Sequence, residues 1–444
     1  MVVSRDKTPT AQETFAQMAQ AAGLRGRLLV TLGLLILVRL GVYIPIPGID
    51  RAKFLEDIGN SPLIGFLDVF SGGGLSALGI FALGILPFIN ASIIMQLLTA
   101  ALPSLENLQK NEGEAGRRKI SQITRYVTVG WASLQSIMLA TWIQSFALEP
   151  GPVFFVETVL AFTAGSMFVM WVSELITERG IGNGASLLIF VNIVAVLPTI
   201  LGNTIDVAQQ GGREEIAKVI ILLLAFLMMI VGIVFVQEGS RRIPIISARR
   251  QVGRRLYRER SNYLPLRLNQ GGVMPIIFAS AMLFLPASLA QFTQGKEGFL
   301  GQLHEGLNQF SNYISINGPT PWAYVLVFFT LIVFFSYFYA SLIVNPVDMS
   351  QNLKKMGSSI PGIRPGKATS EYLERTINRL TFLGAMFLGI VSTVPTAVES
   401  LLGIQTLRGL GATSLLILVG VAIDTAKQIQ TYVISQRYEG MVKQ

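Results

Sequence analysis

Two residue types that carry much of protein chemistry are nearly missing from this sequence of 444 residues. Cysteine is absent, and histidine occurs once, at His304. The chain therefore has no disulfide, thiolate metal ligand or cysteine nucleophile, and one imidazole leaves little for histidine-based metal or acid-base chemistry. The sequence also contains no HExxH and no GxSxG motif. We expect a protein that is not an enzyme and has no catalytic residues, metal or cofactor.

Charged residues are also scarce. They make up 14% of the chain, whereas a typical soluble domain has about 25%. Hydrophobic residues make up 51%, and they gather in runs of about 20 residues, the length that crosses a hydrocarbon core of ~30 Å. The sequence predicts an all-α integral membrane protein with ten transmembrane helices. These spans begin near Leu28, Leu75, Tyr126, Pro152, Ala185, Ile216, Gly271, Trp322, Leu380 and Gly409.

Lysine and arginine are divided unevenly between the two sides of the predicted spans. The two termini and the loops on their side hold 28 of the 35, the opposite loops hold six, and Arg39 lies inside the first span. Because loops rich in Lys and Arg remain in the cytoplasm, we expect both the N- and the C-terminus to be cytoplasmic.

Ten spans cut after the fifth give two halves that enter the membrane from opposite sides, which predicts an inverted pair. We expect an N-tail at 1–27, an N-terminal half at 28–210, a C-terminal half at 211–423 and a C-tail at 424–444. Spans two and seven are both interrupted by helix-weakening residues: Gly84 and Pro87 in one, and Gly271, Gly272 and Pro275 in the other. Broken helices at matched positions are typical of a working site, and ordinary kinks explain the same residues equally well.

Carboxylates near the bilayer midplane, which ion-driven transporters usually contain, are almost absent from the spans. Glu157, Lys218 and Asp424 lie near span ends, where side chains can reach the interface, and Arg39 lies deeper. The main alternative, a secondary transporter with an inverted ten-helix repeat, is disfavoured by this shortage. The spans can instead enclose a pore that a collar of Ile and Phe closes to ions by dewetting. Ordinary packing or lipid contact fits the same residues, and the pattern alone favours that simpler interpretation.

Three loops contain more than a simple connection needs. The outer segment 45–74 predicts a short apolar helix on a glycine-rich tether, too short to span and so lying at the interface or in a cavity. The segment 241–267 holds nine arginines, which favours contact with ribosomal RNA, an acidic protein surface or anionic lipid headgroups. In the third loop, Gly362, Pro365 and Gly366 predict a stiff turn that presents Arg364. We expect the cytoplasmic loops at about 237–270 and 345–379 to form a docking face.

Six stretches of the sequence, in this order, resemble the SecY family, the central subunit of the bacterial and plastid protein-conducting channel. They are DVFSGGGLSALGIFALGILPFINASIIMQLL from Asp68, RGIGNGAS from Arg179, ARRQVGRR from Ala248, GGVMPIIFASAMLF from Gly271, GIRPG from Gly362 and GATSLLILVGVAID from Gly411. The likeness covers nearly the whole chain.

The resemblance implies an hourglass channel that passes unfolded secretory polypeptides and releases signal sequences and transmembrane segments sideways into lipid. Its constriction would consist of Phe81, Ile85, Ala185, Ile189, Ile277 and Ile417, where Ala185 departs from the bulky residue often found at that position. Its lateral gate, between spans two and seven, would be lined by Ile89, Ala281 and Leu285. Its plug, near 62–71, would contain Pro62, Leu63, Ile64, Phe66, Leu67, Val69 and Phe70.

The resemblance also implies partners, because the channel itself has no active site to supply energy. These are the SecE and SecG subunits, the ATPase SecA, the ribosome with its RNA against the basic loops, the translocated polypeptides and the membrane lipids. The docking residues would be Arg254, Arg255 and Arg364. The host membrane would be a bacterial plasma membrane or a thylakoid.

Overall fold

The computed structural model describes most of the chain between residues 22 and 442. Residues 51–52, 55–67, 69–70, 211, 248–250, 253–254, 257–260, 294–304, 311–320 and 403–411 lie outside the description, as do both ends. The chain divides into two compact units, each described here by itself. The first comprises Met1–Asp206, Thr406–Leu410 and Val421–Gln444, and the second comprises Val207–Gln405 and Gly411–Gly420.

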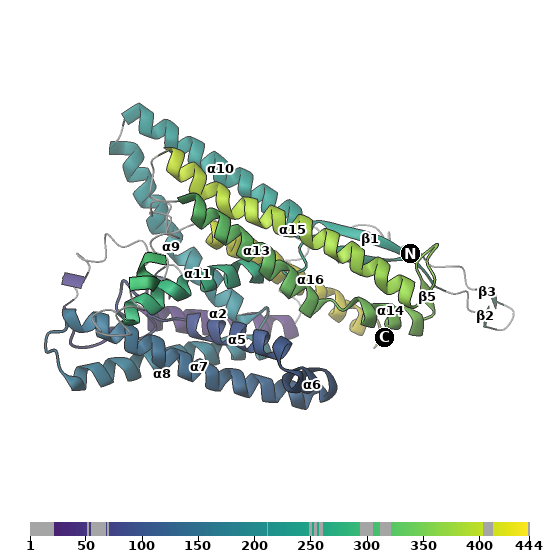
Figure 1. Cartoon of the computed structure of the whole chain (residues 1–444), viewed down its shortest axis with the longest axis horizontal. Coiled ribbons are helices and arrows are strands. Elements are labelled where there is room, and N and C mark those ends of the chain that lie inside the picture. The colour runs from purple at the N-terminus through teal and green to yellow at the C-terminus, as the bar shows by residue number, and fades with distance from the viewer. Residues whose placement is uncertain are drawn as a thin grey trace. The chain divides into compact units, whose positions relative to one another are not determined.

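Helices account for most of both units (Figure 1). In chain order the helices and the short 3-10 turn up to residue 210 are α2 (Ala22–Val42), α5 (Leu86–Ala101), α6 (Pro103–Asn111), α7 (Gly113–Ile143), η1 (Gln144–Phe146), α8 (Pro152–Arg179) and α9 (Gly184–Gln210). The later helices are α10 (Gly212–Glu238), α11 (Met274–Thr293), α13 (Pro321–Ile343), α14 (Pro346–Lys355), α15 (Lys367–Leu402) and α16 (Ala412–Val442).

Each of the ten predicted spans coincides with a helix over at least part of its length. Within the described residues, five helical segments are long and apolar enough to cross a membrane: Pro152–Arg179, Gly184–Asp206, Gly212–Glu238, Trp322–Lys355 and Lys367–Pro395. A sixth is obtained if α5 and α6, which are bent by 103° at their junction, are counted as one broken span. The protein is therefore a multi-pass membrane protein, and the total of ten spans stays a prediction.

Spans two and seven both start with a glycine in the left-handed region of backbone space. Gly84 has φ +53° and precedes α5, whose first turn contains Pro87, and Gly272 has φ +60° and precedes α11, whose first turn contains Pro275. Proline is well accommodated there, because the first backbone N–H groups of a helix have no partner within it. These residues therefore set where the two helices begin. Residues 75–85 of the predicted second span form turns and only the part from Leu86 is helical, so that span is interrupted at Gly84.

Close contacts of small residues join the helices of the first unit. A side chain at Gly165 of α8 would meet the carbonyl oxygen of Ile80, and one at Gly184 of α9 would meet that of Ser173 on α8. Such close backbone approach is common in membrane proteins, where packing and not water exclusion drives helix association. Between α7 and α8, the Arg125 guanidinium forms a two-pronged ion pair with Glu174, with Nη2 2.9 Å from Oε2 and Nε 3.0 Å from Oε1.

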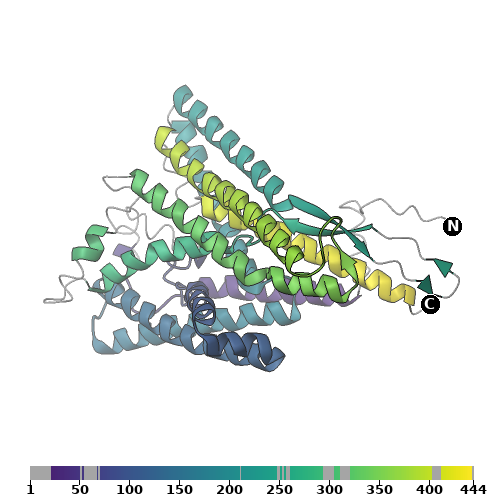
Figure 2. The same cartoon turned by 45° about the vertical axis from the view of Figure 1, so that its right-hand side comes forward.

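The second unit contains a β-sheet that the all-α prediction did not include. Strand β1 (Ser240–Ser247) pairs antiparallel with β4 (Ser261–Arg267), from Ser240 opposite Arg267 to Ile246 opposite Ser261. The short strand β5 (Ser358–Ser359) adds to the other edge of β1, which gives the order β4-β1-β5. Between β1 and β4, β2 (Gln251–Val252) and β3 (Arg255–Leu256) form a second small pair. In Figure 2 the small arrows of β2 and β3 lie beyond the ends of the helices of this unit.

This sheet packs with α14 and the start of α15 around a core of its own. The buried residues are Ile243, Ile245, Leu266, Leu353, Ile360, Leu373, Ile377 and Leu380. They come from both loops that the sequence predicts as a docking face, at about 237–270 and 345–379. We call the ribbon of β1 and β4, with α14, β5 and the first three turns of α15, the cytoplasmic module, because the charge distribution predicts that these loops are cytoplasmic. Its core makes the loops one folded body.

We predict that Leu373→Ala loosens the cytoplasmic module without dissolving the spans. Leu373 is fully buried, and removal of a buried leucine side chain typically costs about 2–5 kcal/mol. Limited proteolysis of the purified membrane protein should then cut within 240–270 or 345–366 much faster than in wild type. Met356→Ala is a suitable control, because Met356 is exposed at the end of α14. Equal cleavage rates in the two variants would contradict this assignment of the core.

Candidate constriction and docking surface

Four of the six predicted constriction residues belong to the first unit. Phe81 and Ile85 lie in the turns that lead into α5, and Ala185 and Ile189 lie one turn apart on α9. Ile85 and Ile189 are almost completely buried, Phe81 is buried and Ala185 is partly buried. Residues four apart share one face of a helix, so Ala185 and Ile189 point in a common direction.

Phe81 has a packing role in addition to any role in a constriction. Its ring stacks on Phe168 of α8, with centroids 5.6 Å apart and an angle of 15° between the planes. The same ring fills the space next to Gly41 of α2 that a side chain at that position would need. Because these contacts are with α2 and α8, replacing Phe81 would disturb helix packing as well as any pore, and Ile85 is the better position for testing the constriction.

The other two constriction residues belong to the second unit and are also buried. Ile277 lies on the first turn of α11, where Ile276, Phe278 and Ala279 are buried too, and Ile417 lies on α16. A helix that is apolar and buried on all sides is enclosed by protein. The low exposure of five of the six side chains argues against lipid contact, one of the simpler interpretations of these residues. Packing is not excluded, and closure of a ring between the two units stays a prediction.

The predicted lateral gate is only partly covered by the description. Ile89 is buried on α5, and Ala281 is partly buried on α11. Leu285 belongs to α11, but its side chain lies outside the description. All seven predicted plug residues also lie outside the described residues, although the tether that follows them, Ser71–Gly74, is described.

Arg364 lies in the turn between β5 and α15, and that turn is tightly fixed. Gly362 has φ +79° and Gly366 has φ +112°, conformations that favour glycine. The buried Ser350 hydroxyl of α14 donates to the Gly366 carbonyl at 2.7 Å, and the buried Thr369 hydroxyl of α15 donates to the Arg364 carbonyl at 2.9 Å. The predicted stiff turn is present, and it leaves Arg364 exposed. The backbone of Arg255 lies in β3, while Arg254 lies outside the described residues.

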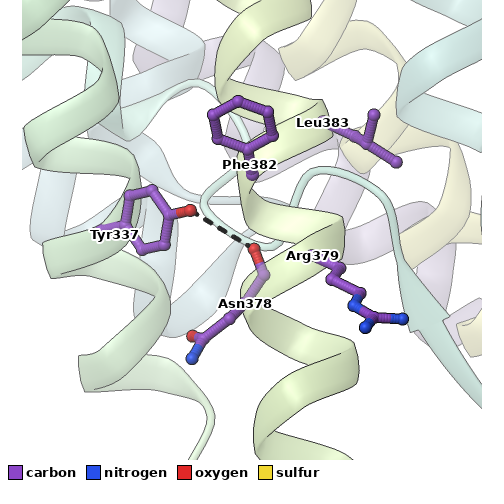
Figure 3. Close-up of a pocket in the computed structure, with 5 residues that line it drawn as sticks. All are labelled: Tyr337, Asn378, Arg379, Phe382 and Leu383. Carbon is purple, nitrogen blue, oxygen red and sulfur yellow. Dashed lines mark hydrogen bonds between the residues drawn. The ribbon is translucent and has the colours of Figure 1, made fainter.

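The second unit has a shallow groove of about 480 Å³ (Figure 3). It lies between α13 and α15 and is lined by Tyr337, Asn378, Arg379, Phe382 and Leu383. The Tyr337 hydroxyl donates to the Asn378 carbonyl at 3.5 Å, and Phe382 and Leu383 are about half exposed. Exposed apolar side chains on a membrane helix are expected to meet lipid.

Among the described residues, no cluster of His, Asp or Glu that could hold a metal ion is found.

The fold and these residues define a class: a multi-pass α-helical membrane protein with buried apolar side chains at the predicted constriction and a folded basic module outside the spans. The model of the SecY family matches residues 79–426. The protein translocase subunit SecY of Synechocystis sp. is 70% identical over 445 residues, which is 100% of both chains. The chain belongs to the SecY family.

Solved structures show the same fold at lower identity. One described as "The structure of a protein conducting channel" has a TM-score of 0.64 and 18% identity, and the match covers 91% of each chain. "Sec61 in the Canine ribosome-channel complex from the endoplasmic reticulum" has a TM-score of 0.61 and 17% identity, again over 91% of each chain. Membership of the SecY family does not favour the transporter alternative.

Proposed function

We propose that the chain is the pore-forming subunit of a protein translocase. Unfolded secretory polypeptides cross through the constriction of Phe81, Ile85, Ala185, Ile189, Ile277 and Ile417. Signal sequences and transmembrane segments leave sideways into lipid past Ile89, Ala281 and Leu285, and the segment near 62–71 plugs the resting channel. Membership of the SecY family is the observation that carries this proposal. The burial of five of the six constriction residues supports it.

An apolar constriction suits this task for two physical reasons. A narrow collar of isoleucine loses its water readily, and a dry collar excludes ions. The same collar presents no hydrogen-bonding group or charge, so an extended polypeptide finds nothing to bind to as it passes. A channel of this kind carries out no chemical step of its own.

Client selection follows from hydrophobic transfer at the lateral gate. A signal sequence with about ten apolar side chains gains roughly 1.5–3 kcal/mol for each one that it removes from water. That gain offsets the separation of the helices that border the gate, because membrane helices are held together largely by van der Waals contacts. A polar segment has no such gain and continues through the constriction.

The energy for movement comes from partners on the cytoplasmic side. We propose that SecE and SecG complete the membrane complex, and that SecA or the ribosome docks on the cytoplasmic module through Arg254, Arg255 and Arg364. Arginine binds both carboxylates and RNA phosphates through paired hydrogen bonds, which suits either partner. Both termini would then be cytoplasmic, in a bacterial plasma membrane or a thylakoid.

The absence of cysteine makes the client path directly testable. Single cysteines at the six constriction positions can each be crosslinked to a secretory chain that is stalled during translocation. We predict adducts from all six positions, because a central path is surrounded by its constriction. Cysteine in place of the exposed Leu227 on α10 is the control and should give none. Adducts from one unit alone, or from the control equally, would contradict the proposed path.

A further inference from the structure

Arg39 lies in the helix of the predicted first span, and its side chain pairs with a backbone carbonyl. It lies in the last turn of α2, where its Nη1 donates to the carbonyl oxygen of Gly72 at 2.6 Å. Its Nη2 lies 3.4 Å from the Tyr43 hydroxyl, and its guanidinium carbon lies 5.7 Å from the Tyr43 ring centroid. Within the described part of the chain, no carboxylate lies within ion-pair distance of Arg39. A charge in a membrane helix is costly and is usually kept for a purpose.

Gly72 is enclosed from two sides. A side chain at this position would meet Nη1 of Arg39 from α2 and Oδ1 of Asn192 from α9, and φ of +69° favours glycine. Both Gly72 and Asn192 are buried. We call Arg39, Gly72 and Asn192 the hinge clamp, because they bring α2, the tether and α9 together.

The tether held by the clamp is itself a rigid turn. The Asp68 carboxylate accepts hydrogen bonds from the backbone N–H of Ser76 at 2.8 Å and from its hydroxyl at 2.7 Å. The Ser71 hydroxyl accepts from the N–H of Leu75 at 3.1 Å, and the N–H of Gly73 donates to the Asp68 carbonyl at 2.9 Å. A force on Gly72 is therefore passed on to the segment that follows, and that segment contains Phe81 and Ile85.

The clamp also lies close to the constriction residues of α9. Asn192 is three residues after Ile189, so the two lie within one turn of that helix. A second attachment joins the segment to the residues just after α2, where the N–H of Ile80 donates to the Ile44 carbonyl at 2.9 Å and that of Ile46 donates to the Leu78 carbonyl at 3.0 Å. Because this attachment does not involve Arg39, loss of the Arg39–Gly72 hydrogen bond would release Gly72 from its place between α2 and Asn192 of α9, while the second attachment remains.

We propose that Arg39 is a positioning residue of the constriction. Through Gly72 it holds the segment with Phe81 and Ile85 in register with Ala185 and Ile189 of α9, and so keeps the first unit's side of the constriction closed. The inference rests on the proposed function, because it assigns those four residues to a constriction.

The test compares Arg39→Gln with Arg25→Gln in the purified translocase complex, reconstituted in planar bilayers without a client. Arg25 lies on the same helix and is exposed, so the control makes the same chemical change outside the clamp. A hydrogen bond to a charged group is strong enough for its loss to raise the open fraction about tenfold to a hundredfold. We expect ion conductance of the idle channel to rise by that factor in Arg39→Gln alone. Export of a client with an intact signal sequence should stay near the wild-type rate.

Two further variants test the role of Arg39 even if Arg39→Gln cannot be purified. Arg39→Lys retains the charge but loses the planar fork, so its conductance should lie between that of wild type and that of Arg39→Gln. Gly72→Ala leaves the arginine in place, inserts a methyl group against both clamp partners, and should also conduct. If Arg39→Gln does not accumulate in membranes, these two variants decide.

Ile417→Asn, in the same bilayers, separates the two possible failures. If it conducts while Arg39→Gln and Gly72→Ala are as silent as wild type, the clamp proposal is wrong and the constriction stands. If Ile417→Asn is silent as well, the assigned constriction itself is wrong.

Discussion

Replacing Ile417 by asparagine is expected to make the resting channel leak ions and to relax its choice of clients. Ile417 is fully buried on α16. Its native side chain needs no hydrogen-bond partner, so an asparagine amide at this position would be left without one. Burying an unsatisfied amide costs about 1–3 kcal/mol, and this cost is avoided when water enters the collar. The wet state should therefore gain about tenfold to a hundredfold in population. Single-channel conductance measures the leak, and export of a client with a defective signal sequence measures the relaxed selection.

Two controls separate polarity from other effects of the substitution. Ile417→Val removes one methylene without adding a polar group, so it should not conduct. Ile390→Asn makes the same chemical change on the half-exposed face of α15, where it should leave both conductance and client choice unchanged. Ile85→Asn should reproduce the effect from the first unit. If Ile417→Asn and Ile85→Asn are both folded, silent and selective, these residues do not form the constriction.

The membrane spans could be predicted from the sequence because a single physical quantity dominates them. A run of about 20 apolar residues has few alternatives to a membrane helix, and a helix is present at each of the ten predicted runs. Local geometry at Gly362 and Gly366 was also predictable, because few residue types other than glycine favour left-handed backbone.

The β-ribbon was not predicted because the many arginines of this segment drew attention to its charge and away from its alternation of apolar and polar residues. In β1 the buried Ile243 and Ile245 alternate with other residues at the period of two that a strand requires, and Leu264 and Leu266 do the same in β4. The nine arginines of this segment favoured a binding loop, and a count of charge does not detect alternation. Weighing periodicity before composition would have predicted the hairpin.

The constriction and the hinge clamp could not be identified from residue patterns alone. Isoleucine is common in every span, so its presence does not distinguish a pore-lining side chain from a packed or lipid-facing one, and the family resemblance supplied the six positions. Arg39 did give a signal, its depth in the first span, but its partner is a backbone carbonyl 33 residues later. A main-chain partner leaves no complementary charge in the sequence by which it could be found.

Reversing the charge at Arg364 is expected to impair motor-driven export far more than assembly of the channel. The side chain is exposed on a turn that hydrogen bonds from Ser350 and Thr369 hold in place, so the substitution changes the surface and leaves the fold intact. Loss of one partner of a buried intermolecular charge pair costs about 2–5 kcal/mol, and a glutamate adds repulsion. Binding of SecA should weaken about thirtyfold or more. Affinity for SecA and the rate of ATP-driven export measure the effect, while the amount of complex in the membrane should match wild type.

Arg375→Glu is the matched control for this prediction. Arg375 is also exposed in the cytoplasmic module, on α15, and the substitution makes the same change of charge away from the turn. If the two variants weaken SecA binding equally, the effect is a general loss of positive charge, and its strong dependence on salt would show this. If only Arg364→Glu has the effect, and it persists in salt, the turn presents a specific docking residue. Unchanged affinity and export in Arg364→Glu would mean that the motor docks elsewhere.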